Sequence, residues 1–299
     1  MPCTPEIFKK NANQVDTQNF ITEHVFEAQT LGSFFQFLTQ QAAMPIGYTA
    51  ASNDWVSEAL LGIDLGVNGA YILPSTTSVQ NMFNEATFRV CAQGLGNTNN
   101  LQDLTLSTTY INSAKATWFG GGTPGWTGKN ERQAKLQIRN VAGTFSYLQF
   151  SYPGGNTGTT KAIWDKFMRP ANWIDLVLSR FDGAYTWGSR TGEPVGPHAQ
   201  LSIRYLYTYW IDLYLGTIES NARGWSASAN TYFQNQWSKN TASGQSFYAG
   251  LFGQGGLATA AQMTFPRPGG GGSVYGVWGN PSQTVGSNGG LVTLPPPAP

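Results

Sequence analysis

Charged side chains are scarce in this chain of 299 residues. Lys, Arg, Asp and Glu make up 11% of it, against about 25% in ordinary soluble domains, and the net charge is only +1. The longest basic run is Lys9-Lys10, and the other cations are scattered singly. Because nucleic-acid binding requires a cluster of cations that neutralises several phosphates, we expect no nucleic-acid partner.

Long apolar runs are missing as well. No stretch approaches the roughly 20 consecutive apolar residues that span a bilayer, and Asp212 and Glu219 interrupt the longest apolar helix candidate. A membrane partner is therefore not expected. Residues 1–14 contain Lys9-Lys10 without an apolar segment behind them, so they do not match a secretory signal. Taken literally this predicts a chain that is not exported, unless it is a mature product or a piece of a longer precursor.

Cysteine is rare, and only Cys3 and Cys91 are present. In an oxidising compartment the two allow one disulfide, which would tie the N-terminal arm to a helix. Two buried free thiols are an equal alternative. A chain of this length buries about 75% of the surface that its unfolded form exposes, so folding requires neither a disulfide nor a metal.

Histidine is equally rare, and one of the two stands in a suggestive string. In Glu23-His24-x-x-Glu27, a helix would place His24 and Glu27 one turn apart, which is a spacing that can bind a metal. A metal site needs three or four ligands, however, and His198 has no ligand spacing around it. We therefore expect no metal and no cofactor, and we interpret Glu23 and Glu27 as solvated carboxylates in the first turn of a helix.

Catalytic motifs are absent. There is no Gly-x-Ser-x-Gly elbow, and Gly94-Leu95-Gly96 follows a helix-like segment instead of a strand, so a phosphate loop is not predicted. Among the acids, Asp212 and Glu219 stand inside an aromatic helix. We interpret them as partners of Arg204 or Arg223, not as catalysts. The sequence assigns no catalytic residue and leans against an enzyme without deciding the question.

Aromatic residues are abundant instead, with 10 Trp, 13 Tyr and 17 Phe. Apolar residues that recur at intervals of three and four predict helices. The segments with this periodicity, first the clear ones and then the weaker ones, are 17–41, 131–149, 160–182 and 198–225, then 78–91, 103–119 and 227–237. We expect Pro170 to divide the third of these into two short helices, and a short strand at 70–73. Segment 198–225 is apolar around most of its circumference, which predicts a buried central helix.

The predicted fold is mainly α: a multi-helix bundle around this central aromatic-rich helix, with long loops. We expect one globular helical domain over residues 1–240. Residues 241–299 lose apolar periodicity and contain Gly269–Gly272 and Pro295–Pro297. This composition predicts an extended Gly/Pro-rich arm or tail.

Two tryptophans are candidates for stacking on a ligand. Trp126 stands in the loop Gly125-Trp126-Thr127-Gly128, and Trp187 precedes Gly188. Flat aromatic faces suit the C–H faces of pyranose sugars, whereas most of the other tryptophans are expected in the core. Together with His24 and Glu27, these two complete the predicted set of ligand-binding residues.

Three segments carry a resemblance to a known family. They are Thr22-Glu23-His24-Val25-Phe26-Glu27-Ala28-Gln29, then Ile138-Arg139-Asn140-Val141 with Tyr147-Leu148, and Trp210 through Trp225. Together they resemble the helical C-terminal region of secreted fungal killer-toxin-like chitinases of glycoside hydrolase family 18, which lies outside the catalytic barrel. The barrel motif Asp-x-x-Asp-x-Asp-x-Glu is absent. The resemblance implies an extracellular, non-catalytic helical module with a binding or interaction role and a carbohydrate partner.

A different class of function fits the composition too. Low charge, many aromatics and a Pro/Gly arm suit a self-assembling structural protein such as a capsid or shell subunit, whose partners are other copies of the same chain. A third alternative is a helical enzyme whose site cannot be recognised in the sequence. A large mass in solution would indicate assembly, and sugar binding would indicate the module. Acidic side chains that line a pocket would indicate the enzyme.

Overall fold

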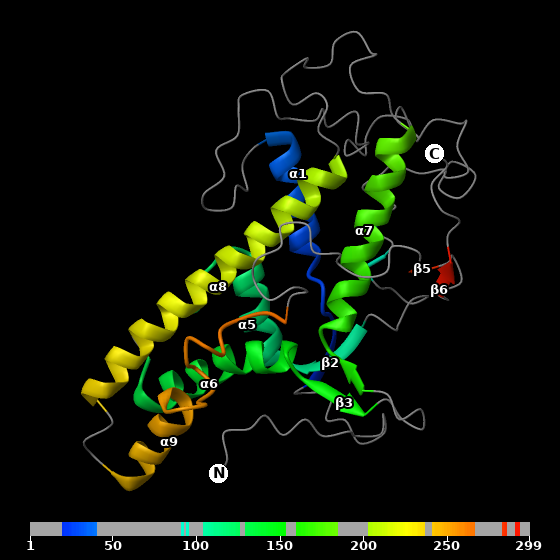
Figure 1. Cartoon of the computed structure of the whole chain (residues 1–299). Coiled ribbons are helices and arrows are strands. Elements are labelled where there is room, and N and C mark those ends of the chain that lie inside the picture. Colours follow the sequence, from blue (N-terminus) through cyan, green and yellow to red (C-terminus); the bar gives the residue numbers. More distant parts are fainter. Residues whose placement is uncertain are drawn as a thin grey trace. The chain divides into compact units, whose positions relative to one another are not determined.

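The computed structural model describes residues 20–40, 91–92, 94–95, 104–125, 129–153, 160–184, 203–236, 241–266, 283–285 and 291–293. These residues are mostly helical, which confirms the predicted mainly α class (Figure 1). The described part contains six helices: α1 (Ala28–Gln40), α5 (Thr109–Phe119), α6 (Glu131–Leu148), α7 (Asp165–Ala184), α8 (Ile203–Gln236) and α9 (Ala242–Phe252). Its strands pair two by two: β1 (Phe20–His24) with β2 (Leu104–Thr108), β3 (Ser151–Pro153) with β4 (Thr160–Ala162), and β5 (Gln283–Val285) with β6 (Leu291–Thr293).

The chain divides into two compact units, each described by itself below. The first unit combines residues within 1–25, 105–165 and 215–267, and the second combines residues within 26–104, 166–214 and 268–299. Helix α8 contributes to both, because its residues up to Tyr214 belong to the second unit and those from Leu215 onward to the first. The β3–β4 hairpin is antiparallel, with Tyr152 opposite Lys161.

Helices of the first unit begin at residues whose side chains cap the free N–H groups of the first turn. At α6, Asn130 accepts the N–H of Gln133 at 3.0 Å, and the Gln133 side chain accepts the N–H of Asn130 at 3.2 Å, which is a reciprocal capping box. At α5, Thr108 accepts the N–H of Ile111 at 3.2 Å. The predicted helix at 131–149 is therefore confirmed with its boundaries nearly unchanged.

Two predicted helices begin with strands instead. Residues 20–24 of the predicted helix 17–41 form β1, and α1 begins only at Ala28. In the same way, the predicted helix 103–119 divides into β2 and α5. The two strands form backbone hydrogen bonds with each other, and the periodicity of a local segment does not predict such pairing. In β1, exposed Thr22 is followed by buried Glu23, and this alternation is typical of a strand.

Pro170 does not divide its helix. Helix α7 runs unbroken through it, contrary to the prediction of two short helices. The missing N–H of Pro170 removes one helical hydrogen bond, to the carbonyl of Lys166, and this bond lies near the N-terminal end of α7. The buried face that Phe167 and Ile174 share extends past the proline and holds both sides in one helix. Similarly, α8 runs continuously where separate helices at 198–225 and 227–237 were predicted.

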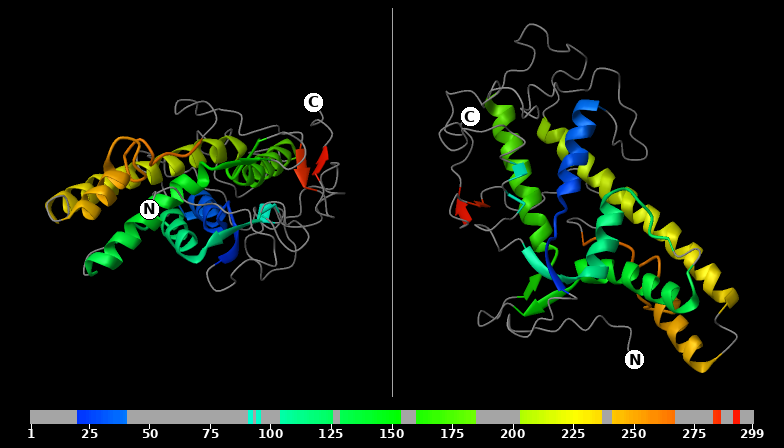
Figure 2. Two further views of the ribbon diagram at one scale, coloured as in Figure 1. Left: turned by 90° about the horizontal axis from the view of Figure 1, so that it is seen from below. Right: turned by 180° about the vertical axis from the view of Figure 1, so that it is seen from behind.

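Residues 241–266 do not form the predicted extended arm. They form α9 and a returning segment, and Figure 2 shows α9 beside the C-terminal part of α8. Tyr248 donates a 2.5 Å hydrogen bond to the side chain of Asn230, and the rings of Phe252 and Phe233 stack at 6.3 Å. The turns that follow α9 disrupt apolar periodicity, so the sequence resembles an arm although the segment is packed. Apart from β5 and β6, the rest of the predicted arm lies outside the described residues, as do the predicted strand 70–73 and residues 78–90 of a predicted helix.

Phe265 lies at the centre of the aromatic core of the first unit. Its ring centroid is 5.2 Å from that of Phe145, 5.7 Å from that of Phe119 and 5.4 Å from that of Trp164. Three hydrogen-bonding side chains attach the surrounding segment. Gln149 donates to the carbonyls of Gln262 and Thr264, Ser226 donates to that of Ala258, and Glu219 accepts the N–H of Phe265. The segment that precedes residue 267 is therefore an integral part of this unit.

The second unit has an aromatic core of its own. The ring centroid of Phe34 of α1 lies 5.0 Å from that of Tyr207 and 5.4 Å from that of Trp210. The rings of Trp210 and Tyr214 stack with their centroids 4.6 Å apart. A close approach of backbone to side chain adds to it, because a Cβ at Gly94 would lie 2.0 Å from Cδ1 of Trp173. Only a glycine at position 94 permits this packing.

Candidate functional site

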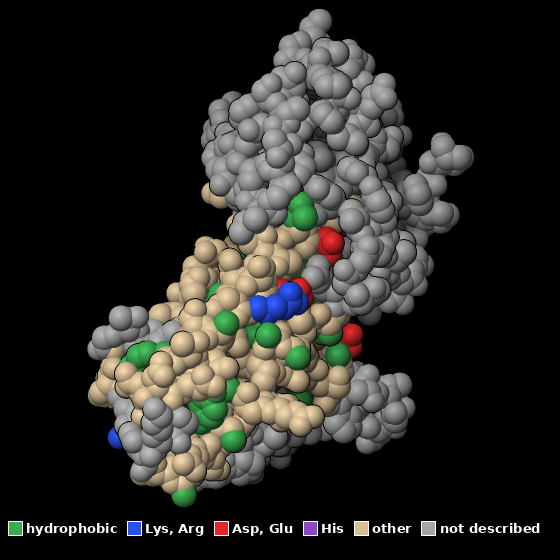
Figure 3. All heavy atoms as spheres, turned by 60° about the vertical axis from the view of Figure 1, so that its left-hand side comes forward, with side chains coloured by type: hydrophobic (Ala, Val, Ile, Leu, Met, Phe, Trp, Pro, Cys, Tyr) green, Lys and Arg blue, Asp and Glu red, His purple; other side chains and the backbone are tan. Residues whose placement is uncertain are grey.

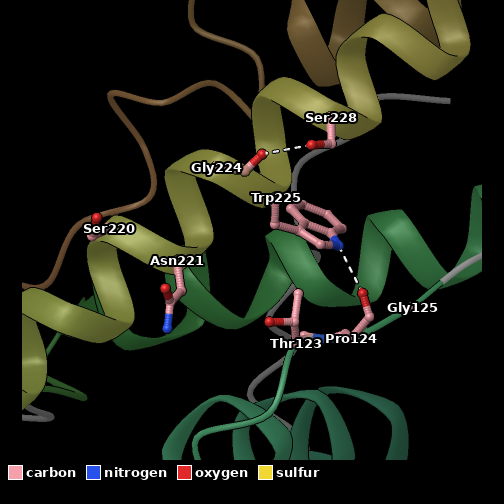
Figure 4. A pocket seen from close by; sticks show the side chains of 8 residues that line it. All are labelled: Thr123, Pro124, Gly125, Ser220, Asn221, Gly224, Trp225 and Ser228. Atoms are coloured by element: carbon pink, nitrogen blue, oxygen red, sulfur yellow. Dashed lines mark hydrogen bonds between the residues drawn. The ribbon is translucent and has the colours of Figure 1, made fainter. Parts of the chain in front are cut away.

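A cavity of about 420 Å³ opens in the first unit between the loop after α5 and helix α8 (Figure 4). It is lined by residues 123–125 of the loop and by Ser220, Asn221, Gly224, Trp225 and Ser228 of α8. The volume falls in the lower part of the range of roughly 300–1,000 Å³ that holds small ligands. We therefore take this cavity as the candidate binding site.

The loop wall of the cavity is held by a specific hydrogen bond. Trp225 Nε1 donates to the carbonyl oxygen of Pro124 at 2.8 Å, and the buried indole meets Trp118 edge-on with centroids 6.1 Å apart (Figure 4). The chain leaves α5 through Gly121, whose φ of +78° is readily adopted only by glycine. The hydrogen bond from Trp225 and the turn at Gly121 thus fix the position of the loop against α8.

The polar groups of the lining are neutral. Thr123 and Ser220 supply hydroxyl groups, and Asn221 supplies a carboxamide that both donates and accepts hydrogen bonds. Within the described part of the chain, none of these three side chains is hydrogen-bonded to a protein atom. Ser228 instead donates to the carbonyl of Gly224 at 3.0 Å. The cavity therefore presents hydrogen-bonding groups to a ligand without attracting either sign of charge.

The two candidate tryptophans, Trp126 and Trp187, lie outside the described residues. Trp126 nevertheless follows Gly125 directly in the chain, and Gly125 lines the cavity. Sequence reasoning therefore selected the residue that follows a cavity-lining glycine in the chain, but it missed the α8 wall. A signal for that wall was present, because Ser220, Gly224 and Ser228 are small residues at intervals of four on one face of a helix.

His24 and Glu27 do not share a helical turn. His24 is the last residue of β1, and Glu27 precedes α1. The backbone carbonyl of Glu27 accepts the N–H of Thr30 at 2.9 Å. Among the described residues, no group of three His, Cys, Asp or Glu side chains is placed to hold a metal ion.

Glu23 is buried, contrary to the interpretation of a solvated carboxylate. Its Oε2 lies 2.9 Å from Nζ of Lys115 on α5, and its Oε1 accepts a 2.5 Å hydrogen bond from the hydroxyl of Tyr147 on α6. Lys115 Nζ also donates to the backbone carbonyl of His24. Lys115 and Tyr147 are buried as well, so this cluster ties β1 to two helices from inside the unit. Sequence reasoning missed it because the partners are far apart in the chain.

Glu219 pairs with Arg223, one of its two predicted partners. The Arg223 Nη2 to Glu219 Oε2 distance is 3.6 Å across one helical turn, with Arg223 half-exposed and Glu219 buried. Oε1 of Glu219 accepts the backbone N–H of Phe265 at 2.7 Å. This second contact assigns the carboxylate a structural role, because it attaches the segment after α9 to α8.

Cys91 belongs to the second unit and is a buried free thiol. Burial raises the pKa of the Cys91 thiol, so little reactive thiolate forms at neutral pH. Burial likewise raises the pKa of the Tyr207 hydroxyl, with further contributions from Asp175 and Cys91. Cys3 lies outside the described residues, and the Cys3–Cys91 disulfide stays a prediction.

Comparisons with protein-family models, with curated proteins and with solved structures return no match for this chain. None of the helices in the described ranges combines the length and the apolar character that crossing a membrane requires. Functional inference therefore starts from the cavity and from the surface around it. On the face in Figure 3, described charged side chains are few and the hydrophobic ones form small separate patches.

Proposed function

We propose that this chain is a non-catalytic helical binding module whose ligand is a neutral carbohydrate. The observation that carries the proposal is the cavity between residues 123–125 and α8, which is lined by hydroxyl and carboxamide groups and lacks ionisable side chains. The loop wall continues directly into Trp126. Sugar hydroxyl groups pair with such donors and acceptors, and an aromatic ring suits the apolar face of a pyranose.

A charged ligand fits the same cavity poorly. The lining offers no counter-charge that would favour a charged ligand over a neutral one. Catalysis is disfavoured for a related reason, because no acid or histidine lines the cavity to act as a general acid or base. Binding without chemical conversion of the ligand is the role that this lining supports.

The proposal includes the context implied by the sequence resemblance. It places the chain among extracellular modules that accompany fungal killer-toxin-like chitinases, which makes N-acetylglucosamine oligomers the first ligands to try. It also includes the finer architecture: a multi-helix bundle around the aromatic-rich α8, followed beyond residue 266 by a Gly/Pro-rich arm. The aromatic contacts of Trp225 and Phe233, both on α8, support that architecture for the first unit.

Calorimetric titration with soluble N-acetylglucosamine oligomers tests the proposal. Asn221→Ala removes the carboxamide from the cavity, whereas Asn235→Ala makes the same change at an exposed position of α8 outside the lining. Loss of one hydrogen bond is worth about 0.5–1.5 kcal/mol, so we expect affinity to fall about threefold to tenfold for Asn221→Ala only. Trp126→Ala should weaken binding as well.

Two results would reject the proposal. One is the absence of binding heat in calorimetry, and of NMR line broadening, with every neutral oligosaccharide tested at millimolar concentration. The other is binding that Asn221→Ala and Asn235→Ala leave equally unchanged, because the ligand would then bind elsewhere. Glucose, galactose and N-acetylglucosamine oligomers compared side by side identify which neutral sugar the cavity prefers.

A second candidate function, self-assembly, rests on four large apolar side chains of the first unit. Leu106 and Tyr110 are 48% and 57% exposed, and Leu136 and Tyr232 are exposed as well. With so little charge, copies of the chain repel one another weakly. Light scattering separates the candidates, since assembly predicts a large mass that Leu106→Ser with Tyr110→Ser reduces. A monomer at all concentrations excludes assembly and leaves carbohydrate binding.

A further inference from the structure

Gly224 occupies the interior of α8, where glycine is an unfavourable residue. Glycine destabilises a helix interior relative to alanine, because it loses more conformational freedom on folding. Some glycines of this chain have a steric or conformational reason for their position. At Gly94, for example, a Cβ would meet Trp173, and Gly121 and Gly255 have positive φ angles.

Gly224 has neither reason. A Cβ at this position would have no atom within 4 Å, and its φ is not among the positive values. Gly125, across the cavity on the loop, likewise has open space around its Cβ position. Both glycines line the cavity (Figure 4). Because both positions line the cavity, a side chain at either one would change its shape.

We propose that Gly224 and Gly125 determine the specificity of the cavity by keeping a gap for one pyranose ring. This inference rests on the proposed carbohydrate function and adds the mode of recognition. One face of the ring lies against the backbone at Gly224, and its hydroxyl groups reach Asn221 and Thr123. Given its volume, the cavity takes one or two sugar rings, so the ligand is a chain end or a short oligosaccharide.

The α8 side of the gap suits this use because its backbone is already satisfied. Ser228 donates to the carbonyl of Gly224, so that oxygen does not need the ligand as a partner. The opposite wall is fixed by the bond from Trp225 to Pro124, and the two walls therefore keep their separation when a ring enters. Pre-organisation of this kind reduces the ordering that binding would otherwise require.

The experiment compares Gly224→Ala, Gly224→Leu and a matched control, Gly32→Ala. Gly32 lies in the interior of α1 in the second unit, and a Cβ there would also have no atom within 4 Å. Both alanine variants should raise Tm by about 2 °C, because they reduce the conformational freedom of the unfolded chain. Affinity for the oligosaccharide that binds the native chain should fall at least tenfold in Gly224→Leu, fall less in Gly224→Ala, and stay unchanged in Gly32→Ala.

The outcomes separate this inference from the function on which it rests. If the native chain binds an oligosaccharide and Gly224→Leu binds it within twofold, the role of the glycines is refuted while carbohydrate binding stands. If Gly224→Ala lowers Tm whereas Gly32→Ala raises it, Gly224 has a structural role and the inference is again overturned. If the native chain binds no neutral sugar, the proposed function fails together with the inference.

Discussion

Lys115 Nζ lies 2.9 Å from Glu23 Oε2, and the two side chains are only 0% and 2% exposed. A charge removed from water to this extent is tolerated only when it is paired and hydrogen-bonded. The hydroxyl of Tyr147 and the carbonyl of His24 supply the additional hydrogen bonds. Because the side chains of Lys115, Glu23 and Tyr147 are all buried and Glu23 contacts the other two, we assign the cluster to stability.

Removing one member of this cluster should destabilise the protein strongly. We expect Lys115→Met alone to lower the free energy of unfolding by about 3–5 kcal/mol, because it leaves the Glu23 carboxylate buried without a counter-charge. The triple variant Lys115→Met, Glu23→Leu, Tyr147→Phe removes all three polar groups and should recover most of the loss. Urea denaturation measures both values. If the triple variant loses as much stability as Lys115→Met alone, or more, the charges themselves are essential.

Stability should fall at alkaline pH through Cys91. Burial raises the pKa of this thiol, so the folded state retains its proton at pH values where the unfolded chain loses it, above about 8.5. The stabilisation is complete below that pH and is lost as pH rises, at up to about 1.4 kcal/mol per pH unit. Cys91→Ala should flatten the profile between pH 8 and 10, as followed by urea denaturation. A variant with the native pH profile would contradict this assignment.

Phe265 should be among the most sensitive positions outside the helices. Its ring contacts three others, so Phe265→Ala should cost about 3–5 kcal/mol through lost burial and an unfilled cavity. Phe265→Leu keeps most of the volume and should cost much less. Thermal unfolding measures the two variants. A small effect of Phe265→Ala would mean that residues 253–266 are not attached to the first unit as described.

Gly94 and Gly32 should respond in opposite directions to the same substitution. Gly94→Ala places a Cβ 2.0 Å from Cδ1 of Trp173 and should cost about 1–3 kcal/mol or more, because the indole must move within a packed core. Gly32→Ala meets no atom and should stabilise. Trp173→Leu combined with Gly94→Ala should relieve part of the loss. If Gly94→Ala is neutral, Gly94 does not pack against Trp173 of α7 as described.

Helices with one long apolar face were predictable from the sequence, and elements defined by a distant partner were not. Ile138, Val141 and Phe145 repeat at helical intervals, and the bounds of α6 agree with the predicted helix 131–149 to within one residue. Strand β1 depends on β2, which lies about 80 residues away in the chain, and a local window contains no trace of that pairing. Helix α9 was missed because its glycines and polar residues interrupt the apolar pattern.

The candidate site was predictable only in part, for a similar reason. Trp126 was predicted as a ligand-binding residue because it stands in the glycine-containing loop 125–128, where a tryptophan is more exposed than in the core. Asn221 and Thr123 come from different elements, and neither belongs to a motif. The buried role of Glu23 was beyond local reasoning as well, because the sequence next to a carboxylate does not reveal a lysine that approaches from another helix.

The first unit is built from separate segments of the chain, and this has a consequence for the order of folding. Its described residues come from three separate stretches, and its core includes Val25 near one end and Phe265 near the other. Such a core cannot close until Phe265 has been synthesised and has left the ribosome. Contacts over so long a span also slow folding, since the intervening chain must be ordered first. Newly made chains will expose the aromatic side chains of α5 and α6 until that segment has been synthesised, and exposed apolar surface of this kind favours aggregation during the interval.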